Sequence, residues 1–362
     1  MKQFMKKKSI FTRSKNNPIL KPNPDREWDS FKVYNPGAVF SETDGKIHLF
    51  YRGMNRGENW RSTIGHAISD DGEAFVSLDT PALRPETAAE LRGLEDPRVT
   101  LIEDTYYMAY GAYDGNDVRL SIATSKDLYD WQKRGPAFKD FKFLKYGGHR
   151  RVRLKEKSIN YDDDSLEGKE RSKSGGIFPE KINGKYWMIF GEFTMWLAMS
   201  DDAIHWNVLK KPFLTGRHDS VLDCAFVEMG PPPIKTDKGW LVFYHGIDER
   251  KTYRLGFLLL DLNDPREILF RSNEPIFWPE APYEMRGIID VLPGGLNKLQ
   301  KMNNHELEEF LDENVRKKLM PAVTFCCGAV IRDDEIRIYY GAGDSYICSA
   351  AGSIKEILKL IR

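Results

Sequence analysis

The sequence has few cysteines, no excess of either charge and no long apolar run. Its four cysteines, Cys224, Cys326, Cys327 and Cys348, form no CxxC pair, so they indicate neither a zinc site nor a disulfide framework. The 54 Lys and Arg residues balance the 54 Asp and Glu residues, which argues against a partner such as nucleic acid. No uncharged apolar run is long enough for a membrane-spanning helix, so no membrane partner is expected.

Other signals are also missing. No phosphate-binding glycine loop, HExxH zinc helix or GxSxG elbow occurs, so we expect no metal and no organic cofactor. The basic segment 1–15 is followed by no apolar segment, so no secretory signal is visible. A cytoplasmic location is the default expectation, and a periplasmic or secreted one would follow if a signal had been removed. The sequence leaves the oligomeric state open, a homo-oligomer included.

Aromatic residues, by contrast, are abundant. They make up 12% of the chain and include 8 Trp and 16 Tyr. Because Tyr and Trp combine an apolar face with a polar group, this excess fits either a sugar ligand or a large β core.

One pattern recurs along the whole chain. An apolar strand, a polar turn, an aromatic strand ending in Gly, an "SxD" strand and a Pro-x-apolar tag follow one another in five copies. Turn pairs such as Asp44-Gly45 and Asn183-Gly184 separate the strands. The fifth copy lacks the last tag, but "NPIL" at 17–20 supplies one near the N-terminus.

The five copies predict an all-β fold. We expect 1–362 to form a single five-bladed β-propeller, closed by the N-terminal strand, with blades that start near 35, 95, 175, 228 and 325. An open two-sheet sandwich is the alternative, and the fivefold count disfavours it. Two insertions interrupt the pattern. Residues 139–174 are highly charged, and 297–320 predict an amphipathic helix that starts with the capping pair Asn303 and Glu306.

In a propeller the ligand site normally lies on the axis, where the openings of the repeats converge. These openings carry carboxylates, amides or cations where a β core would favour Val or Ile. Convergent polar strands suit a polyhydroxylated ligand, and paired carboxylates suit the chemistry of glycosidic bonds.

The motifs "NPGAVF", "GLEDPRVT", "FPEKINGKYWMIFG", "PPPIKTDKGWLVFYHG", "PEAPYE" and "IRIYYGAGD" together resemble glycoside hydrolase family 130. The resemblance spans roughly 35–344, apart from the insertions. This family contains β-mannoside phosphorylases and β-1,2-mannosidases. The resemblance therefore implies a five-bladed propeller and an inverting enzyme that acts on β-linked manno-oligosaccharides.

The resemblance also implies roles for individual residues. Asp96 of "EDPR" would be the general acid, with a pKa that burial beside Glu95 would raise. Further matches to substrate-binding positions are Asn35, Arg52, Glu95, Arg98, Lys181, Asp223, His245, Arg254 and Asp344.

The nucleophile decides between the two activities of the family. A phosphorylase needs cations that hold phosphate, whereas an inverting hydrolase needs a carboxylate that activates water. In "DCAFVEMGPPPI", Glu228 stands where the phosphorylases have glycine, so we predict a hydrolase with Glu228 as the base. Glu280 is a second candidate base, and Glu284 is a weaker one.

Other features favour phosphorolysis. Arg150, Lys173 and His245 match the phosphate-binding cations of the phosphorylases, and inorganic phosphate would then be the co-substrate.

Two further classes are open. A non-catalytic carbohydrate-binding propeller would not need an acid opposite a base. In the related arabinosidases and fructosidases the first repeat opens on Asp, and this chain has Asn35 there.

Overall fold

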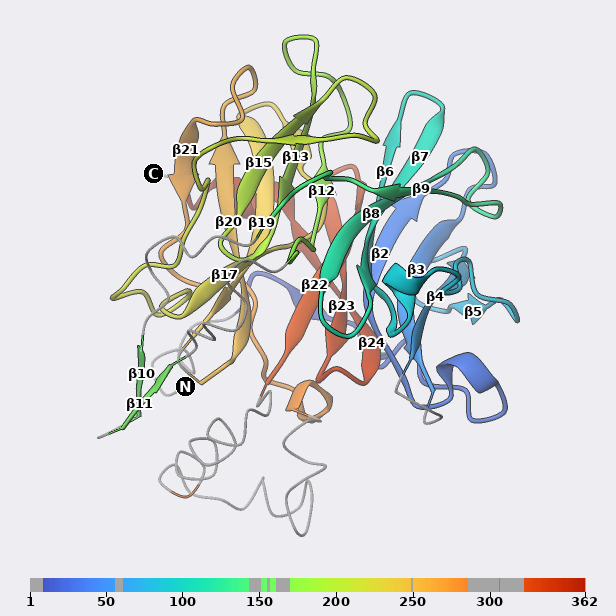
Figure 1. Cartoon of the computed structure of the whole chain (residues 1–362). Coiled ribbons are helices and arrows are strands. Elements are labelled where there is room, and N and C mark those ends of the chain that lie inside the picture. The colour runs from blue at the N-terminus through green and yellow to red at the C-terminus, as the bar shows by residue number, and fades with distance from the viewer. Residues whose placement is uncertain are drawn as a thin grey trace.

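The computed structural model describes residues 9–55, 61–142, 151–154, 157–160, 170–248, 250–285, 306 and 322–361. In this part the fold is all-β with almost no helix (Figure 1). The regular helical elements with described bounds are the 3-10 turns η1 (Glu27–Asp29), η3 (Ala88–Glu90) and η5 (Pro282–Met285) and the helix α4 (Ile354–Leu358).

The strands fall into antiparallel groups that follow the sequence repeats, and a parallel bridge between Ser62 and Gly93 joins the first two groups into one sheet. The first group contains β2 (Lys32–Phe40), β3 (Ile47–Met54), β4 (Ser62–Ser69) and β5 (Val76–Ser77). The second contains β6 (Gly93–Ile102), β7 (Thr105–Tyr113), β8 (Val118–Ser125) and β9 (Gln132–Pro136). The third contains β12 (Gly176–Ile177), β13 (Tyr186–Phe190), β15 (Trp196–Ser200) and β16 (Asn207–Val208).

The C-terminal half continues the series. The fourth group contains β17 (Phe226–Met229), β18 (Ile234–Thr236), β19 (Gly239–Ile247), β20 (Tyr253–Leu260) and β21 (Ile268–Arg271). The short strand β14 (Glu192–Phe193) pairs with β17 and joins the third group to the fourth. The fifth group contains β22 (Thr324–Arg332), β23 (Glu335–Ala342), β24 (Tyr346–Ser353) and β1 (Thr12–Arg13).

The N-terminal segment completes the fifth group. Thr12 and Arg13 pair antiparallel with Ala351 and Ala350 of β24. The sequence predicted this edge strand at 17–20, but only Leu20 of that stretch makes a bridge, to Ile347. Backbone hydrogen bonds from Ser14 to Ser349 and from Ile19 to Ile347 continue this pairing, so the N-terminal segment follows β24 over a longer stretch than the tag alone indicated.

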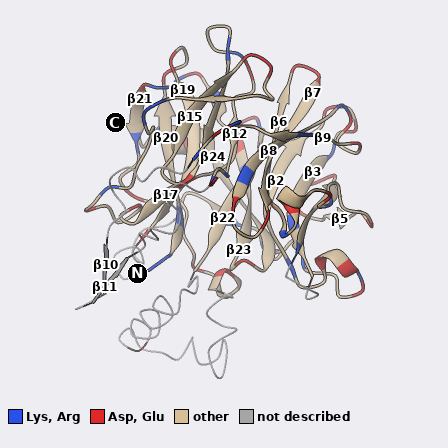
Figure 2. Cartoon of the chain, viewed as in Figure 1, with Lys and Arg blue, Asp and Glu red and all other residues tan. Residues whose placement is uncertain are grey.

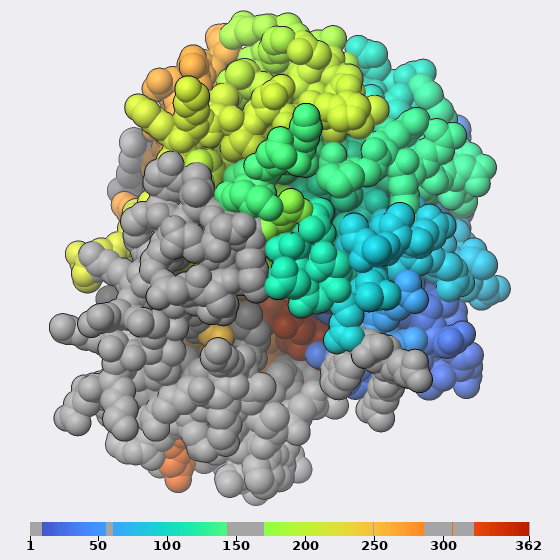
Figure 3. Space-filling view, in the orientation of Figure 1, coloured from blue at the N-terminus to red at the C-terminus, as the bar shows by residue number. Residues whose placement is uncertain are grey.

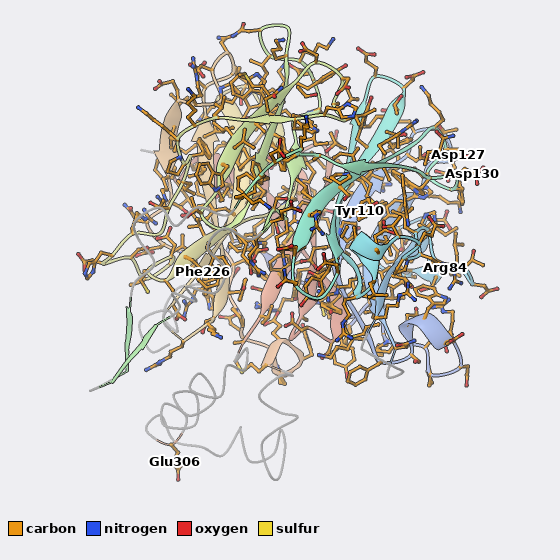
Figure 4. All side chains as sticks on the ribbon, in the orientation of Figure 1. Arg84, Tyr110, Asp127, Asp130, Phe226 and Glu306 are labelled. Carbon is orange, nitrogen blue, oxygen red and sulfur yellow. The ribbon has the colours of Figure 1, made fainter. Side chains whose placement is uncertain are left out.

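The recurring "SxD" motif forms the same turn in each of the first three groups. After β8, the Ser125 hydroxyl donates to Asp127 Oδ1 (3.0 Å), and Asp127 Oδ1 accepts the backbone N–H groups of Tyr129 and Asp130. Asp127 and Asp130 are labelled in Figure 4. The motif recurs because these side chains satisfy backbone groups that the end of a strand leaves without partners.

The core is divided into clusters that lie between neighbouring groups. One cluster joins the first and second groups through Phe50, Leu94 and Met108, and others join the second to the third and the third to the fourth. A further cluster joins the fourth and fifth groups, and another joins the fifth back to the first through Tyr339 and Leu49. Strand segments are accordingly mostly uncharged in Figure 2, and charged residues gather on the loops.

The first strands of the groups lie near one another. Strand β2 contacts both β22 and β6, and β6 also contacts β12 and β22. On the face shown in Figure 3, part of the C-terminal segment is visible as a small red patch near the centre, beside residues of the N-terminal half. The openings of the repeats therefore converge, as the sequence predicted.

Two predictions concern the insertions. Within 139–174 the described part includes a hairpin of β10 (Arg151–Leu154) and β11 (Lys157–Asn160). The helix predicted at 297–320 lies outside the described residues except for Glu306, which is helical and is labelled in Figure 4. None of the described helices is long and apolar enough to cross a membrane.

Candidate active site

Two backbone bulges create the first half of the candidate site. The register of β2 against β3 shifts between Tyr34 and Gly37, and the register of β6 against β7 shifts between Glu95 and Arg98. Asn35 (φ 52°) and Asp96 (φ 49°) are left-handed at these bulges, and each precedes a proline. Asn and Asp tolerate this conformation better than other non-glycine residues, and a bulge redirects the side chain.

The two bulges bring Asn35 and Asp96 into direct contact. Asn35 Nδ2 donates a 2.8 Å hydrogen bond to Asp96 Oδ1, and both side chains are buried. The approach depends on small neighbours, because a Cβ added at Gly341 would lie 2.3 Å from Asn35 Oδ1. The recurring Asp-Pro and Asn-Pro pairs therefore position functional groups as well as turning the chain.

Lys173 occupies the centre of the cluster. Its Nζ lies 3.0 Å from Asp96 Oδ2, 3.7 Å from Glu228 Oε1 and 3.8 Å from Glu95 Oε2. Because Nζ is this close to both, Asp96 Oδ2 and Glu228 Oε1 lie no more than 6.7 Å apart. A separation of more than about a dozen ångströms would favour a non-catalytic binding site, and this upper limit is well below it.

Arg52 closes the cluster on the side of β3. Its guanidinium lies 2.8 Å from Glu95 Oε1 and 3.9 Å from Asp96 Oδ1. Asp96 is thus flanked by two cations, Lys173 and Arg52, and by the amide of Asn35.

Glu228 lies on β17, between two strands that also carry titratable groups. It pairs in register with Glu192 of β14 and with His245 of β19. Ser174 Oγ donates a 2.6 Å hydrogen bond to Glu228 Oε1, and Glu228 is only 1% exposed. Arg171 neutralises the neighbouring Glu192 with hydrogen bonds of 2.6 Å and 3.1 Å.

The two central carboxyl groups have opposite pKa shifts. Burial raises the pKa of Glu228 to about 7, because the attraction of Lys173 is too weak to offset it and Glu192 adds repulsion. Burial also acts on Asp96, but there Lys173 and Arg52 outweigh it and hold the pKa well below its ordinary value. The expectation that burial would leave Asp96 with a raised pKa is therefore wrong for the unliganded protein.

Asp344 is a further member of the site region. It is left-handed (φ 50°) in the turn between β23 and β24. Burial raises its pKa, and Lys32, Asp96 and Arg52 are among the charges that act on it.

Several residues expected in the site lie elsewhere. Lys181 is exposed in the turn before β13, where its Nζ lies 4.7 Å from the centre of the Tyr186 ring. Glu280 is 47% exposed and pairs with Arg13 (2.9 Å). Glu284 is fully buried, but it binds Arg13 at 2.7 Å and 2.9 Å and so fastens the N-terminal segment to η5.

Other expected site residues are held in hydrogen bonds within the fold. Arg98 donates to the backbone carbonyls of Asp96, Met229 and Gly230. Asp223 accepts from Arg217, Arg271 and the Tyr244 hydroxyl. Arg254 lies 2.7 Å from Asp248.

Of the three cations expected to bind phosphate, two lie within the described residues, and neither is a free positive charge there. Arg150 lies outside the described residues, and Lys173 already faces carboxylates. His245 is fully buried, its Nε2 accepts the Cys326 N–H (2.8 Å), and burial lowers its pKa to about 3, so it is neutral. Among the described residues, no three His, Cys, Asp or Glu side chains form a cluster suited to a metal ion.

Two residues of the cluster were missed by the sequence analysis. Ser174 and Arg171 belong to the charged insertion, where the register of the repeats is lost. Ser174 is left-handed (φ 58°), a property that no sequence motif here indicates. Glu192, which directly follows the motif "FPEKINGKYWMIFG", was given no role in the site.

An all-β fold with buried, paired carboxylates at the converging strand openings defines a carbohydrate-active enzyme. Residues 10–292 match the family model described as β-1,4-mannooligosaccharide phosphorylase. The chain belongs to glycoside hydrolase family 130, whose members are enzymes that act on β-mannosides.

Three known proteins illustrate the relationship. A 1,2-β-oligomannan phosphorylase of Thermoanaerobacter sp. (strain X514) is 34% identical over 95% of this chain and 98% of its own. The β-1,2-mannobiose phosphorylase of Listeria innocua, solved with β-1,2-mannobiose, has a TM-score of 0.72 at 25% identity over 97% of this chain and 99% of its own. The third protein has a solved structure that accompanies the finding that this family of mannoside phosphorylases contains glycoside hydrolases that target β-1,2 mannosidic linkages in Candida mannan. It has a TM-score of 0.73 at 28% identity over 95% of this chain and 94% of its own.

Proposed function

We propose that the chain is an inverting glycosidase that hydrolyses β-1,2-linked manno-oligosaccharides, with Asp96 as the general acid and Glu228 as the general base. The observation that carries this proposal is the pair of buried carboxylates that both approach Lys173 Nζ, so that Asp96 Oδ2 and Glu228 Oε1 are at most 6.7 Å apart. This upper limit reaches the lower end of the range of about 6.5–9.5 Å that inverting glycosidases need between their carboxyl groups, so that a water molecule fits beside the sugar.

The charge of the cluster favours water over phosphate as the nucleophile. In the described part of the chain, the three cations Arg52, Arg171 and Lys173 are each paired with at least one carboxylate. These carboxylates are Glu95, Asp96, Glu192 and Glu228, so the cations carry no surplus charge that would hold a phosphate dianion. Water has no such requirement.

Glu228 also has a suitable proton affinity for a base. A general base is most effective when its pKa lies near the working pH, and the pKa of Glu228 is about 7. Asp96 needs a proton before it can protonate the leaving oxygen. Lys173 and Arg52 hold the pKa of Asp96 well below its ordinary value, so the proposal requires that substrate binding raise it until Asp96 carries a proton while Glu228 is ionised.

The steps that follow are those of a single displacement. Glu228 accepts a proton from water as the water oxygen bonds to the anomeric carbon. The bond from that carbon to the glycosidic oxygen breaks, its electron pair stays on the oxygen, and Asp96 supplies the proton. Proton NMR of a fresh reaction tests this, since inversion of a β-mannoside gives α-mannose first. A first product in the β-anomer would refute the mechanism.

Phosphorolysis is the second candidate, and the phosphorylase activity of the relatives favours it. Phosphate would then replace water, mannose 1-phosphate would be the product and inorganic phosphate the co-substrate. The role of Glu228 separates the two candidates, because a phosphorylase needs no base.

We further propose that 1–362 form one domain, a ring of five four-stranded blades closed by β1. The core clusters support this, since they join the groups in cyclic order and the last group also packs on the first. A variant lacking residues 1–20 should lose stability cooperatively across the whole chain. Two separate thermal transitions would contradict a single closed ring.

A further inference from the structure

Ser174 has an unusual conformation beside the proposed base. It directly follows Lys173, it is 1% exposed, and its backbone is left-handed (φ 58°). Serine rarely adopts this conformation, and such backbone strain concentrates at functional sites, where the surroundings must hold it in place. The residue therefore invites a functional explanation.

The contacts of Ser174 provide one. Its Oγ donates to Glu228 Oε1 at 2.6 Å, and Lys173 Nζ approaches the same oxygen at 3.7 Å. Both neighbours act on Oε1. With both contacts on Oε1, the carboxylate presents Oε2 as its second acceptor.

We propose that Ser174 is a positioning residue, which holds Glu228 Oε1 so that Oε2 takes the proton from the attacking water. This inference rests on the proposed function, in which Glu228 is the base. The Ser174 hydroxyl keeps its own proton throughout. The water O–H bond breaks, its proton passes to Oε2, and the new oxygen bond forms at the anomeric carbon.

The electrostatic surroundings make the pH profile a useful readout. The groups that act on Glu228 are Lys173, Ser174, Glu192 of β14 and Asp96 of β6. Arg171 is paired with Glu192, and His245 on β19 is neutral. Of these, the Ser174 hydroxyl stabilises the ionised carboxylate by direct donation, so its removal should raise the pKa of Glu228.

Ser174→Gly and Ser174→Ala distinguish the effect of losing the hydroxyl from the effect of the left-handed backbone. Both remove the hydroxyl, but glycine relieves the left-handed strain and alanine keeps it. We expect kcat to fall about 10- to 100-fold in both variants, with KM changed less than about twofold. The acidic limb of the kcat profile should move to higher pH by about one pH unit.

Ser172→Ala is the matched control. Ser172 is also a buried serine of this segment, but its Oγ accepts the backbone N–H of Leu120 and no contact joins it to Glu228. The acidic limb of the kcat profile of Ser172→Ala should lie at the same pH as in the wild type. An unmoved limb in both Ser174 variants, or normal kcat in Ser174→Gly, would overturn the inference.

Glu228→Gln distinguishes failure of this inference from failure of the proposed function. If Glu228→Gln is inactive while the Ser174 variants keep the wild-type kcat and the wild-type position of the acidic limb in the kcat profile, only the role of Ser174 is refuted. If Glu228→Gln is fully active, Glu228 is not the base and the inference fails with the proposed function.

Discussion

Replacing Asp96 by Asn tests the proposed acid with little change in shape. Asn tolerates the left-handed backbone at φ 49°, and its side-chain oxygen can still accept from Asn35. The variant loses the negative charge and the transferable proton. Losing one partner of a buried ion pair typically costs about 3–5 kcal/mol. Here Lys173 keeps Glu228 at 3.7 Å and Glu95 at 3.8 Å, so we expect only about 1–3 kcal/mol.

The kinetic effect should be much larger than the structural one. Loss of a general acid typically reduces the rate by about 10²- to 10⁴-fold, and we expect this loss in kcat for β-1,2-mannobiose. Released mannose measures the rate, and thermal unfolding measures the stability.

An activated substrate shows which step is lost. The phenolate of an aryl β-mannoside made from a strongly acidic phenol leaves without protonation. Asp96→Asn should therefore keep far more of the wild-type rate on this substrate than on the disaccharide. Glu228→Gln should remain slow on both substrates, because water still needs a base. Near-normal disaccharide cleavage by Asp96→Asn would refute the reasoning. The opposite pattern, with Glu228→Gln rescued by the activated substrate, would reverse the two roles.

Three other predictions follow from the same contacts. Because Glu228 must be ionised to act as a base and its pKa is about 7, kcat should rise as the pH increases through about 7, and a profile that falls there would contradict the assignment. Glu284→Gln should lower the free energy of unfolding by about 3–5 kcal/mol in thermal or urea unfolding, because it leaves the Arg13 charge poorly paired. Its kcat, measured below the melting temperature, should not change, and a loss of kcat in the folded variant would mean that Glu284 acts in the site. Asp127→Ala removes the acceptor of two backbone N–H groups and should cost about 1–2 kcal/mol with unchanged kcat, which unfolding and mannose release would check.

The sequence predicted the fold better than it predicted the site. The Ser125–Asp127 type of turn and the glycine turns are local, so their chemistry is readable residue by residue. Asn35 and Asp96 were also found, because both lie in motifs that carry the family resemblance.

The remainder of the site depends on contacts between distant parts of the chain. Lys173 and Ser174 meet Glu228 across a separation of more than fifty residues, and the insertion before them conceals the repeat register. Glu280 was misplaced because the same motif also holds Glu284, whose bond to Arg13 serves the N-terminal edge strand. The pKa of Asp96 was misjudged because the sequence did not reveal that Lys173 and Arg52 both face it.

The most direct test of the central claim is the phosphate dependence of β-1,2-mannobiose cleavage. Enzyme dialysed free of phosphate should release mannose at the full rate, and added phosphate should neither accelerate the reaction nor yield mannose 1-phosphate. Dialysed enzyme that stays inert until phosphate is added, and then forms mannose 1-phosphate, would contradict the hydrolase and establish phosphorolysis.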